Sequence, residues 1–441
     1  MGFQKKTRVL VVGAGMAGAG AAMYCSMAMD GKKEDIANVT LIDGAPYPAN
    51  DVASSAGDSR MYRKMYSDPF YAKMQEFALE KNWRELEAMC GEQLLVANGL
   101  LFYGEETGET VEGSVLGAKK TMEELGIPFE SFPSGKDIDA RWAGVRAGDK
   151  PRYEGVFEHT AGHARAAPTC NAMVRVARAH GCEVMYYDGL KHLKKVGNDG
   201  FVWEATTERG NVYHAQKVIL CLGGWTREFF NRELGLDVNL DIWRVHYTHY
   251  EVDKGIAAQG GYPQMFCFRK ERDGGNDGGL YYAFSPNATE TAPDMIGPGG
   301  KSNPQIKVGV DFKTLKERDT PQTMAQFDYT PSEDVLAMID DWVRNNMNGI
   351  GRRTSTYVAP YSMTRDPYFL LDCLPGDMKD VVVFAGGSGR AFKFGPLLGE
   401  CLARLALEQE TPIDVSNFRI TRETMGLRKI GQPALPQTAK M

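Results

Sequence analysis

A glycine-rich turn close to the start of the chain constrains its fold more than any other feature. The apolar run of residues 8–12 leads into Gly13-Ala14-Gly15-Met16-Ala17-Gly18, and a segment with helical spacing follows. A second apolar run, residues 39–42, ends in Asp43. Strand, tight turn, helix and strand in this order predict the first unit of a Rossmann fold that binds a dinucleotide.

The three glycines of the turn have separate expected roles. Gly13 permits the sharp turn, Gly15 lets a pyrophosphate approach the backbone, and Gly18 lets the helix pack closely on the sheet. The free N–H groups at the start of the helix favour the anion. Asp43 can accept hydrogen bonds from ribose hydroxyls. The motif alone does not distinguish FAD from NAD.

Two later segments repeat the pattern of a buried strand that ends in glycines. The first begins at Lys217 and ends in Gly223-Gly224-Trp225, and the second begins at Asp380 and ends in Gly386-Gly387-Ser388-Gly389. Both ends are expected at the carboxyl edge of the sheet, where the backbone can approach a ligand. Because about 200 residues separate the first glycine motif from Lys217, the Rossmann sheet must be discontinuous in sequence.

The intervening chain predicts a second domain. Residues 94–103 suggest two paired strands joined by an Asn98-Gly99 turn, and residues 240–252 and 305–312 alternate as strands do. We therefore expect an antiparallel sheet packed on the Rossmann domain. Residues 271–303 are rich in Gly, Pro, Asn and Asp, and predict a long loop. That loop is either a lid or specificity element, or a surface insertion.

Composition argues against several other classes. A formal net charge of −6 without a basic block argues against nucleic acid, and the longest apolar stretches fall short of a membrane span. His159 and His163 lack a third ligand nearby in sequence, so we expect no metal. Scattered cysteines without a Cys-x-x-Cys pair favour the cytoplasm. Ala439-Lys440-Met441 is a variant of the Ser-Lys-Leu signal, so a peroxisomal location is the alternative.

Four further segments, spread over nearly the whole chain, carry a family pattern. They are Gly57-Asp58-Ser59-Arg60-Met61-Tyr62-Arg63, Lys307-Val308-Gly309, Tyr361-Ser362-Met363-Thr364-x-Asp366-x-x-Phe369 and Gly389-x-x-Phe392-Lys393-Phe394. These segments resemble four segments of the sarcosine oxidase family. The first resembles its Gly-Asp-Thr-Arg-x-x-Arg motif, and the second resembles its strand whose lysine lies beside the flavin. The third resembles its Tyr-Thr-x-Thr-Pro-Asp-x-x-Phe motif, and the fourth its Gly-His-Gly-Phe-Lys motif. This family belongs to the D-amino acid oxidase superfamily of FAD enzymes. In its length and its long insertion, the chain looks more like the fructosyl-amino-acid oxidase (amadoriase) branch than like the short bacterial sarcosine oxidases.

The resemblance implies FAD and a D-amino acid oxidase-like fold. An α/β Rossmann-type FAD-binding domain (residues 7–90, 155–235 and 355–430) would pack on an α+β substrate domain with an antiparallel sheet (91–154 and 236–354). Residues 431–441 would form a C-terminal tail. The expected cofactor-binding residues are Gly13, Gly15, Met16, Ala17, Gly18, Asp43, Gly44, Ser59, Arg60, Gly223, Trp225, Gly387, Gly389, Ala391, Phe392 and Lys393.

Three basic residues acquire roles from the same resemblance. Arg63 and Lys393 would bind the substrate carboxylate, and Arg60 would stabilise negative charge on the flavin. A carboxylate that enters a closed site needs paired cations, because the cost of its desolvation otherwise stays uncompensated. From the residue pattern alone, the ordinary interpretation of Arg60 and Arg63 is a pair of solvated surface arginines. Lys393 could be a surface lysine, but its place between two phenylalanines after a glycine-ended strand argues against that.

Five more positions complete the expected site. Lys307 would promote oxygen reduction, since a buried cation stabilises the negative charge that develops on oxygen. Tyr282 and Tyr361 would line the substrate cavity, unless they are ordinary core tyrosines. Asp311 stands where sarcosine oxidase has a histidine, and could pair with Lys307 or with a basic group of the substrate. Ala359 replaces the cysteine that bonds the flavin in covalent members, so we expect non-covalent FAD.

The function that these features predict is an FAD-dependent oxidase of an amino acid or N-substituted amino acid, with sarcosine itself disfavoured by Asp311. The products would be an imine, which hydrolyses to a carbonyl compound, and hydrogen peroxide. One alternative is a flavin dehydrogenase with an electron acceptor other than oxygen, and another is a flavin-binding assembly factor without turnover. The expected partners are a small amino acid or amine and O2, and the expected state is a monomer or small homo-oligomer.

Overall fold

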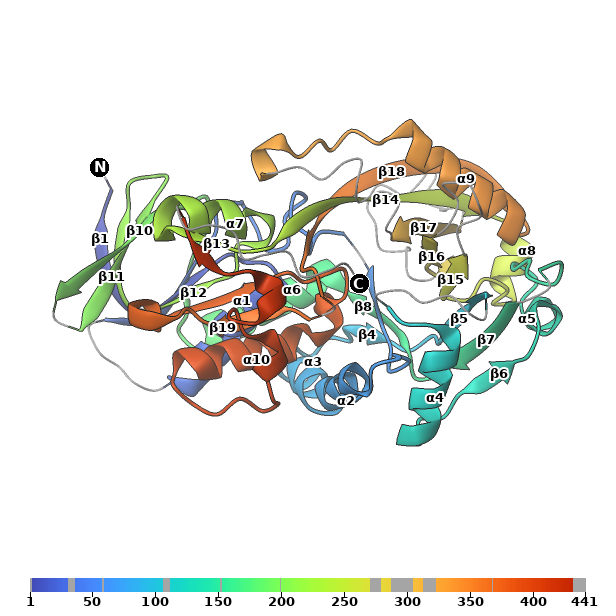
Figure 1. Cartoon of the computed structure of the whole chain (residues 1–441), viewed down its shortest axis with the longest axis horizontal. Helices are drawn as coiled ribbons and strands as arrows, with labels where there is room; N and C mark the ends of the chain where they lie inside the picture. The colour runs from blue at the N-terminus through green and yellow to red at the C-terminus, as the bar shows by residue number, and fades with distance from the viewer. Residues whose placement is uncertain are drawn as a thin grey trace.

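The structure of the protein is a computed structural model that describes residues 2–30, 36–57, 59–105, 112–150, 153–198, 200–269, 279–286, 304–311, 323–366 and 368–430. The side chains of Asn198 and Asp311 lie outside this description. Two eight-stranded sheets occupy opposite sides of the molecule (Figure 1). Most of the loop expected at residues 271–303, and the expected signal at 439–441, fall outside the described residues.

The first sheet has a parallel centre in the order β9-β2-β1-β12-β20. Antiparallel strands extend it, with β19 beside β20 and the pair β10-β11 beside the first half of β12. This arrangement confirms that the Rossmann sheet is assembled from distant parts of the chain. Its strands are β1 (Gln4–Val12), β2 (Ala37–Ile42), β9 (Glu183–Met185), β10 (Leu190–Asn198), β11 (Phe201–Thr207), β12 (Val212–Leu220), β19 (Leu370–Cys373) and β20 (Val381–Ala385).

Both faces of this parallel centre are covered. Helices α1 (Met16–Ala28), α6 (Ala166–Ala179) and α10 (Gly395–Ala406) pack on one face. The other face is covered by β10, β11 and the helical turn α7–η3, residues 226–234. All five residues of β20 are buried. This double burial explains why the central strands are continuous apolar runs instead of alternating ones.

The second sheet has the order β18-β14-β17-β16-β15-β5-β7-β6. Its neighbours are antiparallel as expected, apart from the parallel pair β15 and β5. The long strands β14 and β18 also reach across to the first domain (Figure 1). Its strands are β5 (Leu100–Glu105), β6 (Glu130–Phe132), β7 (Tyr153–Glu158), β14 (Asp241–Val252), β15 (Met265–Arg269), β16 (Gly279–Ala283), β17 (Gln305–Asp311) and β18 (Ile350–Met363).

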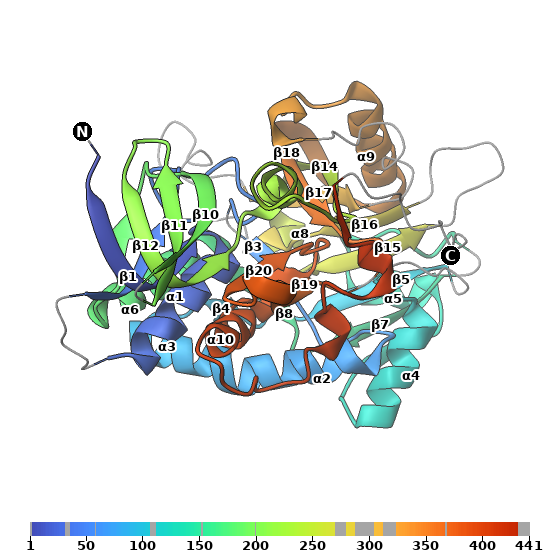
Figure 2. The ribbon, with the colours of Figure 1, turned by 60° about the vertical axis from the view of Figure 1, so that its left-hand side comes forward.

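Helix α9 (Glu333–Asn346) packs on the second sheet, where Trp342 stacks on Tyr281 with ring centroids 5.1 Å apart. The helical stretch α2–η1–α3, residues 69–90, runs along the lower edge of the molecule (Figure 2). Its first helix begins behind Asp68, whose carboxylate accepts the backbone N–H of Phe70 at 2.9 Å. The remaining helices are α2 (Pro69–Phe77), α3 (Arg84–Cys90), α4 (Val115–Leu125), α5 (Gly135–Arg141), α7 (Thr226–Phe229) and α8 (Lys254–Ala258). None of the helices described is long and apolar enough to cross a bilayer.

A small third sheet carries the Arg60 segment. It consists of β3 (Ser59–Tyr62), β8 (Gly162–Arg165) and β4 (Leu95–Val96). The expected pairing within residues 94–103 is wrong, because β4 pairs with β8 while β5 lies between β15 and β7. Gly99 has a φ of +74°, but the buried apolar residues of β5 are matched by partners on both sides in the second sheet. Tertiary packing thus overrides the local hairpin signal.

Two expected domain boundaries fall within strands. Residues 154/155 lie in β7 and residues 354/355 lie in β18, and both strands belong to the second sheet. The chain ends its described part in a short segment that returns to the first domain. There β21 (Arg428–Lys429) pairs with β13 (Leu236–Asp237).

Candidate functional site

A cavity of about 750 Å³ lies along the carboxyl edge of the first sheet. The loops after β1, β12 and β20 all line it, and they include Gly13–Gly18 apart from Ala14, residues 221–225 and residues 384–389. The three glycine-ended strands therefore meet at one site, although they are far apart in the sequence. All the expected cofactor-binding residues line the cavity except Ser59 and Lys393, which lie close behind its wall.

The first glycine turn has the geometry that its pattern predicts. Gly13 has a φ of +101°, which is unfavourable for any residue with a side chain. A Cβ on Gly18 would lie 1.8 Å from the carbonyl oxygen of Gly13, so the helix packs on the strand only with glycine there. A Cβ on Gly15 would meet only Ser55 Oγ, at 3.3 Å. Gly15 thus leaves the start of α1 accessible from the cavity.

Polar groups at this end of the cavity suit a nucleotide. The backbone N–H of Met16 donates to Ser55 Oγ at 3.1 Å, and Asp43 accepts the N–H groups of Ala14 (2.5 Å) and Ala45 (2.7 Å). Burial raises the pKa of Asp43, and these two hydrogen bonds oppose the shift. A helix N-terminus beside a carboxylate is the arrangement that holds a pyrophosphate and a ribose. The lining residues Ser55, Glu208 and Arg232 were not expected from the sequence.

Arg60, Tyr361, Ala391 and Phe392 line the other end of the cavity. The guanidinium of Arg60 donates to the carbonyl oxygens of Ser59 (2.8 Å), Ser54 (2.8 Å) and Ala56 (2.5 Å), and it lies 5.7 Å from the ring centre of Phe392. Arg60 is therefore a half-buried residue held in the cavity wall. A glycine-lined cavity of this size, with a helix N-terminus at one end and a cation at the other, fits FAD.

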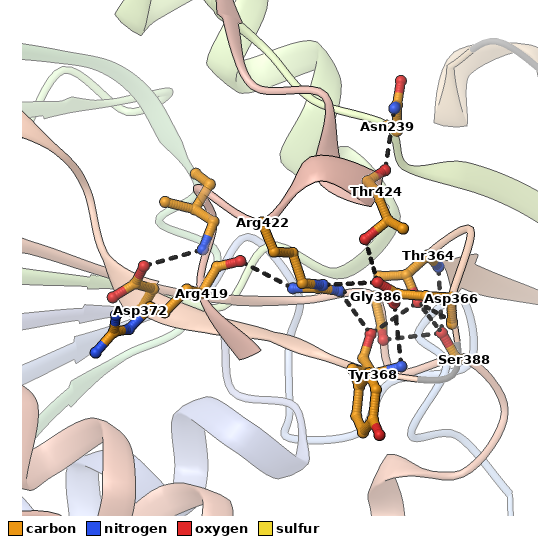
Figure 3. A network of polar contacts seen from close by, with 11 residues as sticks. Asn239, Thr364, Asp366, Tyr368, Asp372, Gly386, Ser388, Arg419, Arg422 and Thr424 are labelled. Carbon is orange, nitrogen blue, oxygen red and sulfur yellow. Dashed lines mark hydrogen bonds and ion pairs between the residues drawn. The ribbon is translucent and has the colours of Figure 1, made fainter. Parts of the chain in front are cut away.

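The loop after β20 is held in a strained shape by a polar network (Figure 3). Ser388 is buried and has a φ of +47°, a conformation that is unfavourable for residues other than glycine. Its hydroxyl lies 3.0 Å from Thr364 Oγ1, which also donates to the backbone near Asp366. Arg422 of the C-terminal segment grips Asp366 through two hydrogen bonds of 2.8 and 3.0 Å. The network therefore ties the C-terminal segment to the glycine loop of the cavity.

A buried basic cluster lies behind the wall at the Phe392 end. Arg63 is 1% exposed and Lys393 is 4% exposed, so neither is a surface residue. Arg63 Nη2 lies 2.5 Å from Glu112 Oε2, and Arg390 Nε lies 3.2 Å from Glu112 Oε1. The ring centre of Tyr66 lies 4.4 Å from the guanidinium of Arg63 and 5.6 Å from the ammonium of Lys393. The structure thus brings the two residues expected to bind the carboxylate to one place.

Glu112 and Arg390 were missed in the sequence. Arg390 carried an available signal, since it stands at the histidine of the resembled Gly-His-Gly-Phe-Lys motif. Glu112 carried none, because it belongs to no motif and pairs with Arg63 across 49 residues of chain.

Lys307 is 7% exposed and lies on β17. Its ammonium donates to Ser59 Oγ (2.8 Å) and to the Ser59 carbonyl oxygen (3.1 Å), and it lies 3.9 Å from the ring centre of Phe284. Burial, with the nearby Lys307 charge, lowers the pKa of His163 to about 4 and of His249 to about 3. Both histidines are therefore neutral at pH 7 beside a lysine. His163 lies on β8 and not in a loop.

Contacts from both domains close into a ring beside the cavity. Tyr361 lines the cavity itself, whereas Tyr282 is buried on the second sheet and belongs to this ring. Asp311 ends β17 opposite Leu280, and its side chain lies outside the described part. Two links of this ring are peptide bonds, which join Ser59 to Arg60 and Phe392 to Lys393. The other links are the contacts Arg63–Phe266 (4.5 Å), Phe266–Tyr282 (6.5 Å), Tyr282–Phe284 (6.2 Å), Phe284–Lys307 (3.9 Å), Lys307–Ser59 (2.8 Å), Arg60–Phe392 (5.7 Å), Lys393–Tyr66 (5.6 Å) and Tyr66–Arg63 (4.4 Å).

A discontinuous Rossmann domain, a second sheet and a glycine-lined cavity between loops define a class of two-domain oxidoreductases with a dinucleotide cofactor. A family model described as FAD dependent oxidoreductase matches residues 8–405. The chain therefore belongs to this family, and FAD is its cofactor.

Proteins of known activity are similar to nearly the whole chain. Monomeric sarcosine oxidase from Bacillus sp. (strain NS-129) is 28% identical over 427 residues, which cover 95% of this chain and 97% of that protein. N-methyl-L-tryptophan oxidase from Salmonella dublin is 24% identical over 417 residues, which cover 95% and 99%.

Solved structures share the fold. The open form of NikD, an unusual amino acid oxidase essential for nikkomycin biosynthesis, matches with a TM-score of 0.78 at 24% identity, over 94% of this chain and 97% of that one. A mutant of Amadoriase I from Aspergillus fumigatus matches with a TM-score of 0.67 at 18% identity, over 95% and 90%. The expected D-amino acid oxidase-like fold is confirmed.

Proposed function

We propose that the protein oxidises an amino acid or N-substituted amino acid at a C–N bond and passes the electrons to oxygen. The observation that carries the proposal is the buried pair Arg63 and Lys393, which lies beside the Phe392 end of the FAD cavity. Buried positive charge is costly, and a substrate carboxylate would compensate it beyond what Glu112 provides through its ion pair with Arg63. An assembly factor has no need of such a pair.

Each side chain of the ring has a distinct role in this reaction. When bound, FAD accepts two electrons from the substrate and delivers them to oxygen. Arg63 and Lys393 hold the carboxylate, and the aromatic wall formed by Phe266 and Tyr282 excludes water and positions the substrate. Arg60, at the Phe392 end of the cavity, would stabilise negative charge on the flavin. Lys307 supplies the cation that favours oxygen over other acceptors.

The names of the similar proteins support the class of substrate. Sarcosine and N-methyl-L-tryptophan are both N-methyl amino acids, and each is in the name of a similar protein. We therefore propose that the substrate carries an amine next to a carboxylate, with a secondary amine as the first choice.

We further propose that FAD is bound without a covalent link. Ala359 lies on β18 next to Pro360 and Tyr361, which line the cavity, and its methyl group cannot form a thioether. Of the eight cysteines, all of which the structure describes, Cys221 alone lines the cavity. It lies at the turn of Gly13 and Gly18, at the nucleotide end, and burial raises the pKa of its thiol. A thiol with a raised pKa carries little of the thiolate that a covalent link to the flavin would need.

A panel of amino acids tests the proposal directly. N-methyl, cyclic, glycated and free amino acids are added anaerobically to the FAD-loaded protein, and loss of the oxidised flavin absorbance is recorded. We expect at least one N-substituted amino acid to reduce the flavin and, in air, to yield one hydrogen peroxide per carbonyl product. If reduction occurs without stoichiometric peroxide, the protein is a dehydrogenase. If no member of the panel reduces the flavin, the proposal fails.

A further inference from the structure

The carboxylate of Glu112 lies within the group of cations that the proposed function assigns to the substrate. Glu112 is 5% exposed, and it joins Arg63, on the β3 side, to Arg390, in the loop after β20. Arg390 is 2% exposed, and its guanidinium lies 5.3 Å from the ring centre of Tyr71. The next carboxylate, Glu158, is taken up instead by the backbone N–H groups of residues 64 and 65. Among the described residues, Glu112 is thus the carboxylate that forms ion pairs with this cluster.

The electrostatics show that Glu112 is ionised. Burial raises the pKa of Glu112, but Arg390, Arg63 and Lys393 together lower it to about 2. The four residues therefore carry three positive charges and one negative charge, a net charge of +2. A substrate carboxylate would leave +1. Because Glu112 and Arg390 cancel each other, the pair leaves unchanged the charge that Arg63 and Lys393 present.

The geometry shows what the pair does instead. Arg63 uses Nε for the carbonyl oxygen of Met65 (3.2 Å) and Nη2 for Glu112 (2.5 Å). Its Nη1 is buried and has no hydrogen-bond partner in the described part of the chain, and the same holds for the hydroxyl of Tyr66 beside it. Two contacts thus fix the plane of the guanidinium and leave the N–H groups of Nη1 for a ligand.

We propose that Glu112 and Arg390 form an internally neutral buried pair that orients Arg63, so that Nη1 is the donor presented to the substrate carboxylate. Glu112 and Arg390 are positioning residues, and they act through Arg63. This inference rests on the proposed function, because it assumes that Arg63 binds a carboxylate. It adds that the Nη1 group of Arg63, whose orientation is fixed by the carboxylate of Glu112, sets the position of the substrate.

Acetate is the probe, since it has a carboxylate and no oxidisable amine. Its Kd for the FAD-loaded protein is measured by calorimetry for Glu112→Gln, Arg390→Gln and the double variant. We expect acetate to bind about tenfold more tightly to Glu112→Gln, because the cluster charge rises to +3, and about tenfold more weakly to Arg390→Gln, where it falls to +1. The double variant restores +2 and should stay within about threefold of the wild type.

The effect of Arg63 orientation is measured separately. The readout is the rate constant for flavin reduction at a saturating concentration of an N-substituted amino acid that reduces the flavin of the wild type. We expect it to fall at least about tenfold in Glu112→Gln and in the double variant alike, although acetate affinity differs between them. Glu112→Asp keeps the charge but shortens the side chain, so acetate should bind as in the wild type while reduction slows. This variant also serves if Glu112→Gln does not fold. Asp237→Asn is the matched control, because Asp237 is likewise held by two arginines and its pKa is also lowered to about 2, at a site away from the cluster. It should change neither quantity.

Acetate that binds Glu112→Gln no more tightly than the wild type would overturn the inference. So would a reduction rate that recovers in the double variant. If Arg63→Met and Lys393→Met leave acetate binding intact, the proposed carboxylate site itself is wrong. If those two variants abolish binding while the Glu112 variants change nothing, only the positioning role fails.

Discussion

Lys307 is a buried ammonium group among aromatic rings and neutral histidines. The ring centre of Phe284 is 3.9 Å from its ammonium, which donates two hydrogen bonds to Ser59. Because the pKa of His163 and of His249 is lowered to about 4 and about 3, neither histidine shares the positive charge at neutral pH. A cation in such surroundings interacts strongly with any negative charge that develops beside it.

Substitution Lys307→Met tests this at the level of one residue. We expect reoxidation of the reduced flavin by oxygen to slow on the order of 100-fold, because one preorganised charge is lost. Reduction by the amino acid should stay within about threefold of the wild type. Stopped-flow absorbance separates the two half-reactions, and Lys217→Met, which alters a lysine paired with Asp380 and Glu408, serves as the control. Equal reoxidation rates in Lys307→Met and the wild type would exclude the role.

His163 makes stability depend on pH. The folded state lowers its pKa from the ordinary 6.5 to about 4, so between these values the unfolded chain binds more protons. The contribution of His163 to the free energy of unfolding is therefore fully present above pH 6.5 and is lost as the pH falls toward 4. The contribution lost between pH 7.5 and pH 5 is about 2 kcal/mol. Urea unfolding of His163→Leu should show a pH-dependent loss smaller by that amount, and an identical loss in both proteins would contradict the lowered pKa.

At the scale of elements, the turn between β1 and α1 separates folding from cofactor binding. Gly18 is required by the packing of helix on strand, since a Cβ there would lie 1.8 Å from a backbone oxygen. Gly15 faces the cavity, where a Cβ has space. Two glycines of one motif thus serve two different purposes.

The variants Gly18→Ala and Gly15→Ala distinguish these purposes. Gly18→Ala should destabilise the apoprotein by about 3 kcal/mol or more through overlap with the backbone. Gly15→Ala should leave apoprotein stability within about 1 kcal/mol of the wild type and weaken FAD at least about tenfold, because a methyl group stands where the pyrophosphate approaches. Urea unfolding and flavin fluorescence titration give the two quantities. Similar effects of both variants on either quantity would refute the separation.

The C-terminal segment is the second element with a definable task. Arg422 binds both oxygens of Asp366 and the carbonyl oxygen of Tyr368, and Thr364 connects this region to the strained Ser388 (Figure 3). Burial raises the pKa of Asp366, but Arg422 and Thr424 lower it below its ordinary value. The segment therefore stabilises the glycine loop of the FAD cavity from behind.

Removal of Arg422 should show this connection. We expect Arg422→Ala to cost about 2–3 kcal/mol of stability, since a half-buried carboxylate loses its partner, and to weaken FAD severalfold. The neighbouring, exposed Arg419→Ala should cost at most about 0.5 kcal/mol. Unfolding by urea and FAD titration measure both effects. Unaltered FAD affinity in Arg422→Ala would show that the network only stabilises the fold.

At the scale of the whole molecule, the cavity that fits FAD is lined by loops that come from all parts of the chain. The cavity is lined after β1, β12 and β20 and by β18, which also belongs to the second sheet. A ligand that holds these segments together stabilises the folded state by mass action.

The non-covalent binding that we propose makes this stabilisation depend on the concentration of FAD. Acid precipitation should release the flavin into the supernatant, and free FAD at 1,000 times its Kd should stabilise the protein by about 4 kcal/mol. Absorbance of the two fractions and unfolding at several FAD concentrations measure this. Yellow colour that stays in the pellet would show a covalent link.

Several features were determined by the sequence alone. The Rossmann unit, its discontinuous sheet and the three glycine-ended strands could be predicted because glycine conformation and helix N-termini are local properties of the backbone. Motif resemblance located Arg63, Lys393 and Lys307. The motifs also contained the one available sign of Arg390.

Only the tertiary structure decided how these parts meet. Burial turned Arg63 and Lys393 from possible surface residues into a cluster, and it added Glu112 as their charge partner. Strand β5 left its expected hairpin because its apolar residues pair with distant strands. In each case the energy comes from contacts between residues far apart in the chain. A charge or an apolar residue finds its partner through space, and no local pattern records which partner that is.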